Sequence, residues 1–125
     1  MDAPPRYPGR APIEAYGNGG FRFAGMSHRG SLLCLGAAVV GWPPTTAEGL
    51  TVDDFALLLA EPEGIELLLI GTGRDFLLPS QKLRSDLRDA AGIRIEPMDT
   101  GAACRTYNVL LAEGRPVGAA LIAVD

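Results

Sequence analysis

Hydrophobic and polar residues follow one pattern in the first third of the chain and another after Pro43-Pro44. In the first third, short β-like segments are separated by glycines, and Ser27–Gly30 carries the signal of a turn between two of them. This pattern predicts an N-terminal β-meander. Its predicted strands are Ile13–Gly17, Phe21–Phe23, Gly30–Leu35 and Ala37–Trp42.

The pattern after Pro44 alternates between helix and strand, which is typical of parallel strands joined by helices. Thr51 and Ser80 are suitable N-caps, and Gly92 is a suitable residue just past a helix end. Ala103, Tyr107, Leu110 and Leu111 form an apolar stripe on a third helix. The sequence therefore predicts helices over about 51–60, 80–92 and 99–114.

Two continuous apolar runs, Ile65–Ile70 and Val117–Val124, are too short for buried helices. They predict strands covered on both faces, and the second should lie in the centre of the sheet. Ile93–Glu96 alternates strictly between apolar and polar residues, so we expect it at an edge. Together these elements predict one α/β domain over residues 13–125, after a flexible N-terminal tail over residues 1–12.

Composition narrows the class of protein. The chain has 125 residues, 47% of them hydrophobic, and a net charge of −4. It is long enough to bury one core and too acidic to coat nucleic acid. Arginines interrupt each hydrophobic stretch, which predicts no transmembrane segment, and residues 1–12 do not resemble a signal or transit peptide. We therefore expect a soluble cytoplasmic protein.

Residue types that commonly carry catalysis or bind metals are sparse. The single histidine, His28, falls in the predicted turn, where we expect it in contact with solvent. Cys34 and Cys104 lack zinc-ligand spacing and are expected to be reduced. Cys104 lies in the first turn of a helix, which can activate a thiol, but a buried apolar role is favoured. We expect no catalytic residue, metal or cofactor.

Gly71-Thr72-Gly73-Arg74 follows the strongest predicted strand, at a position where open α/β sheets place ligand crevices. The segment lacks the third glycine of a dinucleotide fingerprint and the Lys-Ser/Thr of a phosphate loop. The alternative that we favour is a tight turn with Arg74 in solvent.

Small residues open the third predicted helix, and its free backbone N–H groups, with Arg105 nearby, can hold a carboxylate or phosphate. Capping of these groups by Asp99 or Thr100 is an equal alternative. If an anion or small ligand binds, the hypothesis is one crevice shared by both segments. Its residues would be Gly71, Thr72, Gly73, Arg74, Asp99, Thr100, Arg105 and Asn108.

The β-meander offers a second candidate surface. Phe21, Arg22, Phe23 and Trp42 are candidate contacts for a protein partner, because aromatic residues and arginine are favoured at interface hot spots. Phe21 and Phe23 fall on the same face of one strand, however, so a place in the core is the alternative that we favour.

Several motifs together resemble the domain of unknown function 498 family, which includes the mitochondrial NADH dehydrogenase (complex I) assembly factor 3. The likeness covers about Ile13 to Asp125. It rests on Gly19-Gly20-Phe21-Arg22-Phe23, Gly30-Ser31-Leu32-Leu33, Gly71-Thr72-Gly73, Met98-Asp99-Thr100, Ala102–Asn108 and Glu113-Gly114-Arg115. The resemblance implies a three-layer fold around a mixed five-stranded sheet, with the last strand central and antiparallel to the rest.

The resemblance also implies no established catalytic residue and no cofactor. It implies an assembly role through protein contacts, with subunits or assembly factors of respiratory complex I as possible partners. The function that we expect is a non-catalytic interaction or assembly module. The alternative is a small-ligand or anion binder, or an enzyme, using the crevice near Gly71–Arg74 and Thr100–Asn108. A homodimer is compatible with either.

Overall fold

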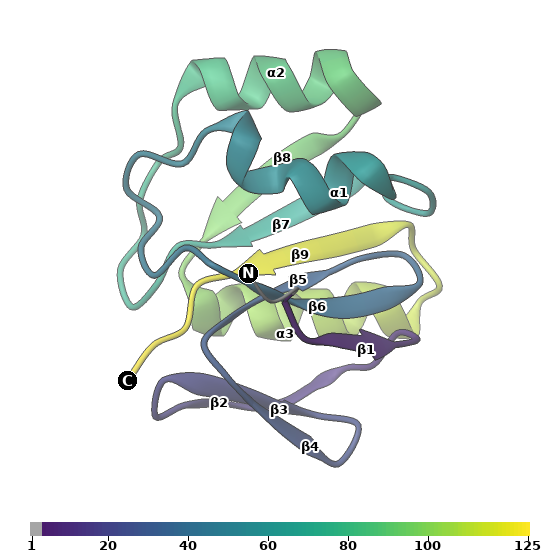
Figure 1. Cartoon of the computed structure of the whole chain (residues 1–125), viewed down its shortest axis with the longest axis vertical. Helices are drawn as coiled ribbons and strands as arrows, with labels where there is room; N and C mark the ends of the chain where they lie inside the picture. Colours follow the sequence, from purple (N-terminus) through teal and green to yellow (C-terminus); the bar gives the residue numbers. More distant parts are fainter. Residues whose placement is uncertain (1–3) are drawn as a thin grey trace.

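A computed structural model describes residues 4–125 of the chain. A six-stranded mixed sheet runs through the middle of the protein (Figure 1). β7 pairs in parallel with both β8 and β9, whereas β9 pairs with β5 in antiparallel fashion, as do the remaining neighbours. In spatial order the strands are β1 (Arg6–Pro8), β6 (Ala38–Trp42), β5 (Ser31–Cys34), β9 (Val117–Leu121), β7 (Leu67–Gly71) and β8 (Arg94–Met98).

Each face of this sheet has its own covering layer. One face packs against η1 (Val52–Phe55), α1 (Ala56–Ala60) and α2 (Gln81–Ala91). The other packs against α3 (Thr100–Ala112) and a separate three-stranded antiparallel sheet. Figure 1 shows that small sheet at the far end of the molecule from α2. Its strands are β2 (Ile13–Gly17), β3 (Gly20–Phe23) and β4 (Met26–Arg29).

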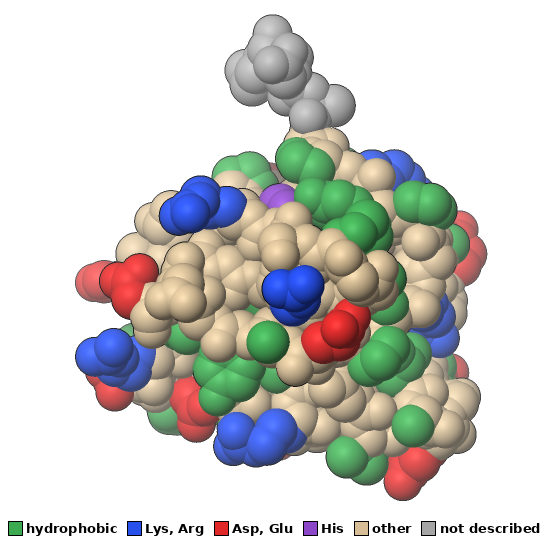
Figure 2. Space-filling model, turned by 90° about the horizontal axis from the view of Figure 1, so that it is seen from below, with side chains coloured by type: hydrophobic (Ala, Val, Ile, Leu, Met, Phe, Trp, Pro, Cys, Tyr) green, Lys and Arg blue, Asp and Glu red, His purple; other side chains and the backbone are tan. Residues whose placement is uncertain are grey.

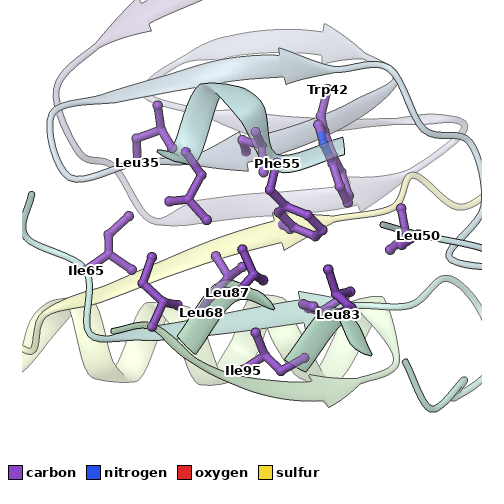
Figure 3. Packing of buried hydrophobic residues seen from close by; sticks show 14 of the residues in the cluster. Leu35, Trp42, Leu50, Phe55, Ile65, Leu68, Leu83, Leu87 and Ile95 are labelled. Atoms are coloured by element: carbon purple, nitrogen blue, oxygen red, sulfur yellow. The ribbon is translucent and has the colours of Figure 1, made fainter. Parts of the chain in front are cut away.

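The alternation of side chains along β7 explains its unbroken apolar sequence. Leu68 and Ile70 join the core beneath η1, α1 and α2, while Leu69 points into the core beneath α3. In the first core, Trp42 packs against Phe55 with ring centroids 5.3 Å apart (Figure 3). Because both faces are buried, Leu68, Leu69 and Ile70 all lie in apolar surroundings.

The predicted helices and their caps are confirmed. The Ser80 hydroxyl accepts the Leu83 N–H at the start of α2, and Gly92 ends that helix at φ 66°. Thr51 and Asp54 form the capping box before η1. Asp99 caps α3 through the Ala102 N–H. These local hydrogen bonds satisfy helix-end donors without a tertiary partner, which is why the sequence predicts them well.

The structure corrects three predictions about the strands. The sheet has six strands rather than five, because Arg6–Pro8 form β1 on the edge of β6, within the segment expected to be a flexible tail. Residues 1–3 of that segment lie outside the described part of the chain. The expected turn at Ser27–Gly30 is instead largely β4. The last strand is interior, as expected, but it is parallel to β7 and antiparallel only to β5.

The edge position predicted for Ile93–Glu96 is confirmed, since β8 is the last strand of the large sheet. The solvated position predicted for His28 is wrong. His28 lies in β4 with 8% of its surface exposed. Its Nε2 donates to the Ser31 carbonyl at 3.2 Å, and its Nδ1 is hydrogen-bonded to the Tyr7 hydroxyl at 3.0 Å. Tyr7 belongs to β1, and the missed strand therefore explains the missed burial.

Candidate functional site

The parallel strands β7, β8 and β9 all end at one edge of the large sheet, where their arrowheads point in Figure 1. A groove of about 720 Å³ lies at this edge. Three loop segments form most of its wall: residues 42–48, residues 72–77 and residues 122–125. The carboxyl edge of an open α/β sheet is the usual place for a binding site.

Gly71, Thr72, Gly73 and Thr100 lie together at this edge, and hydrogen bonds within the chain occupy their polar groups. The Thr100 hydroxyl accepts the Gly73 N–H at 2.9 Å and donates to the Ile122 carbonyl at 2.7 Å. The Thr100 N–H in turn donates to the Gly73 carbonyl. These hydrogen bonds close the ends of β7 and β9 onto α3, and Thr72 and Gly73 also line the groove.

Asp99, Arg105 and Asn108 do not line the groove. The Asn108 side chain binds the backbone of Ile13 twice, accepting its N–H at 2.7 Å and donating to its carbonyl at 2.8 Å. The Tyr16 hydroxyl lies against Gly101 in the first turn of α3, with the exposed Arg105 beside it. Of the residues predicted to share one crevice, Thr72, Gly73 and Arg74 line the groove, whereas Asp99, Arg105 and Asn108 lie outside it. For Asp99 the cap alternative is the correct one.

An exposed apolar run that the sequence analysis missed begins on the wall of the groove and continues past it. Phe76, Leu77 and Leu78 are 58%, 40% and 67% exposed, one after another, in the loop between β7 and α2. The buried Thr72 fixes this loop, since its hydroxyl donates to the Asp75 carbonyl and accepts the Leu77 N–H. Arg74 precedes the run and also lines the groove. The available signal was three large apolar residues outside any helical or strand period.

The core position favoured for Phe21 and Phe23 is confirmed, and the partner contact predicted at Trp42 is corrected. Phe21, Phe23 and Trp42 are 3%, 1% and 4% exposed, so they belong to the two cores. The Trp42 indole N–H already has a partner within the chain, because it donates to the Asp54 carbonyl at 2.7 Å. Of the four residues, Arg22 alone is exposed and can reach a partner.

Both cysteines are unpaired and buried, as predicted. Burial raises the pKa of the Cys34 thiol to about 12. Burial likewise raises the pKa of Cys104 to about 12, against a smaller lowering effect of Arg105. Neither is an activated nucleophile. Within residues 4–125, no three His, Cys, Asp or Glu side chains are grouped to hold a metal ion. None of the helices in the same range has the length and apolar character to cross a bilayer.

The chain is similar to proteins of known sequence and structure. Residues 13–122 match the model of a family described as "Protein of unknown function (DUF498/DUF598)". An uncharacterised protein of Rhodobacter capsulatus is 44% identical over 118 residues, covering 94% of this chain and 89% of that protein. A Bartonella henselae outer membrane protein has a crystal structure that superposes with a TM-score of 0.88 at 51% identity, covering 95% of this chain and 99% of that one.

A human relative is the NADH dehydrogenase [ubiquinone] 1 alpha subcomplex assembly factor 3. It is 41% identical over 112 residues, which cover 88% of this chain and 59% of that protein. The match to the mouse assembly factor 3 covers a similar share of that protein, 62% of its length. The chain thus spans about three fifths of the length of these assembly factors.

Proposed function

The chain belongs to the DUF498/DUF598 family, and on that premise we propose that it is a protein-interaction module that assists the assembly of respiratory complex I. The family relationship to a complex I assembly factor supplies the process. The single observation that carries the interaction role is the exposed run Phe76-Leu77-Leu78, of which Phe76 and Leu77 line the groove.

An exposed run of this kind is costly unless a partner covers it. Consecutive apolar residues on a surface favour aggregation, and they are expected only where they serve a function. Here the loop is not loosely placed, because the Thr72 hydroxyl holds it through the Asp75 carbonyl and the Leu77 N–H. A rigid apolar loop beside a groove is a suitable docking surface, since little conformational entropy is lost when a partner binds.

The same geometry argues against the ligand-binding alternative at the predicted crevice. The polar groups of Thr72, Gly73 and Thr100 already have partners within the chain. A small ligand that bound through these same groups would have to displace these hydrogen bonds, each of which is worth about 1 kcal/mol.

The test is genetic, in the organism that encodes the chain. Deletion of the gene should lower the NADH:ubiquinone activity of membranes and the amount of full-size complex I on native gels. The wild-type chain should restore both, whereas a double variant, Phe76→Ser with Leu78→Ser, should not, although it folds normally. Val109→Ser is the matched control, because Val109 is 57% exposed on α3, away from the groove, and should behave as wild type. Normal complex I in the deletion strain would refute the assembly role.

A further inference from the structure

The exposed apolar run separates two hollows in the surface of the protein. One is the groove of about 720 Å³, and the other is a smaller hollow of about 270 Å³. Leu77 lines both hollows, Phe76 lines only the groove, and Leu78 lines only the smaller hollow. The run is therefore a ridge with a depression on each side, and there is space for the side chains of a partner on both sides of Leu77.

The charged residues of the two loops around this ridge are mostly acidic. Glu48 and Asp75 line the groove, and Glu48 also lines the smaller hollow. Glu48 and Asp54 line a third hollow, which adjoins the groove along residues 43–48. Arg74 is the basic residue that these loops contribute to the groove. Three carboxylates and one guanidinium group thus surround the ridge from this side.

These carboxylates are not neutralised within the chain. Among residues 4–125, none of Glu48, Asp54 and Asp75 forms an ion pair with an arginine or lysine side chain. The Asp54 carboxylate is occupied, because it accepts the Thr51 N–H in the capping box. Glu48 and Asp75 are exposed, which leaves their carboxylates able to meet a partner.

Other parts of the surface do not show this excess of negative charge. Arg29 and Asp125, which have opposite charges, line another part of the groove and both lie beside Gly19. Figure 2 views the molecule from the side of β2, β3 and β4, and acidic and basic side chains are interspersed there. The excess therefore belongs to the loops that carry and adjoin the apolar run.

From the ridge and its acidic surroundings we infer that the protein partner docks through a cationic amphipathic segment. This inference rests on the docking role proposed for the apolar run. Apolar side chains of the segment pack on both sides of Leu77, and its lysines or arginines pair with Glu48 and Asp75. The apolar contact supplies most of the affinity, whereas the charges select the partner. Anionic lipid and RNA are disfavoured, because carboxylates repel phosphate groups.

The test measures the binding of two labelled amphipathic peptides to the full chain. Each peptide has about 14 residues, or four helical turns, with the same leucine positions and with either lysine or glutamate at the polar positions. The lysine peptide should bind about tenfold more tightly at low salt, and the difference should shrink as salt is raised. The double variant Phe76→Ser with Leu78→Ser should weaken its binding about tenfold.

A second double variant, Glu48→Gln with Asp75→Asn, isolates the charges. It should weaken the lysine peptide about fivefold, the effect of losing two exposed ion pairs, and should not weaken the glutamate peptide. Glu63→Gln with Glu66→Gln is the matched control. It removes two exposed carboxylates near the opposite end of β7 and should leave the affinity for the lysine peptide unchanged.

Equal affinity of the two peptides would overturn the inference, and so would an equal loss of binding in the control variant. Tighter binding of anionic lipid vesicles or of an RNA oligonucleotide to the ridge would assign it to a different class of partner. The assembly role is judged separately in the deletion strain. Equal peptide affinities together with lost complex I would refute only the cationic partner, whereas normal complex I would refute only the assembly role.

Discussion

Tyr107 places a phenol in the fully buried layer between α3 and the sheet. Its hydroxyl has no well-formed hydrogen bond within residues 4–125, and its polar neighbours are the Cys34 thiol and Arg10. Burial raises the pKa of Tyr107 above its usual range, so the phenol remains neutral. An unsatisfied buried hydroxyl costs about 1–3 kcal/mol, so removal of the Tyr107 hydroxyl should not destabilise the protein.

Tyr107→Phe should therefore leave the free energy of unfolding unchanged or raise it by about 1 kcal/mol. Tyr107→Ala should lower it by about 3–5 kcal/mol, because it opens a cavity between α3 and the sheet. Urea unfolding followed by circular dichroism measures both values. A loss of more than about 2 kcal/mol in the phenylalanine variant would mean that the hydroxyl has a partner that matters for stability.

At the residue scale, sequence reasoning succeeded where a side chain's surroundings are local. Ser80, Thr51 and Gly92 act within their own helix ends, and all three were predicted. His28 was misplaced because its burial depends on Tyr7, which comes from a distant strand. Asn108 was grouped with a ligand crevice, although it holds the backbone of Ile13, 95 residues away.

At the element scale, the two hairpins of the small sheet use similar turns with different residues. Asn18-Gly19 joins β2 to β3 with φ angles of 53° and 78°, and Ala24-Gly25 joins β3 to β4 with φ angles of 50° and 74°. Positive φ at both positions is the signature of a type I′ turn, for which Asn-Gly is the preferred sequence. Alanine pays about 1 kcal/mol or more in the left-handed region, because its Cβ approaches the backbone.

Ala24→Gly should consequently raise the free energy of unfolding by about 0.5–1 kcal/mol, with the relief of strain exceeding the added entropy of the unfolded chain. Asn18→Gly is the matched control and should change it by less, because asparagine tolerates this conformation. Thermal melts of the three proteins give the comparison. If both glycine variants shifted the melting temperature equally, strain at Ala24 would not be the cause.

Some elements could be predicted from the sequence pattern and others could not. β7 was expected from its apolar run, since it pairs on both edges and is buried on both faces. β1 has three residues and one proline, too little for a periodic signal. The apolar loop at Phe76–Leu78 has no period either, so the candidate docking surface became visible only once exposure was known.

At the scale of the whole molecule, the large sheet ends in two edges that are protected differently. β8 carries Arg94, Glu96 and Pro97, residues that discourage pairing with another strand. On the other side β6 consists wholly of buried residues and is covered by β1. Backbone hydrogen bonds continue beyond both ends of β1, where the Gly41 N–H donates to the Pro5 carbonyl and the Gly9 N–H donates to the Ala37 carbonyl.

A chain that begins at Arg10 should therefore expose the edge of β6 and self-associate. An uncovered, apolar edge strand is a template for pairing with a second copy, so we expect a dimer or larger species at micromolar concentration and a lower melting temperature. Light scattering after gel filtration measures the first effect and calorimetry the second. Arg6→Gln is the control, because it removes only the exposed Arg6–Glu61 ion pair and leaves β1 in place. If the shortened chain matched the full chain in both size and melting temperature, β1 would not be what protects this edge.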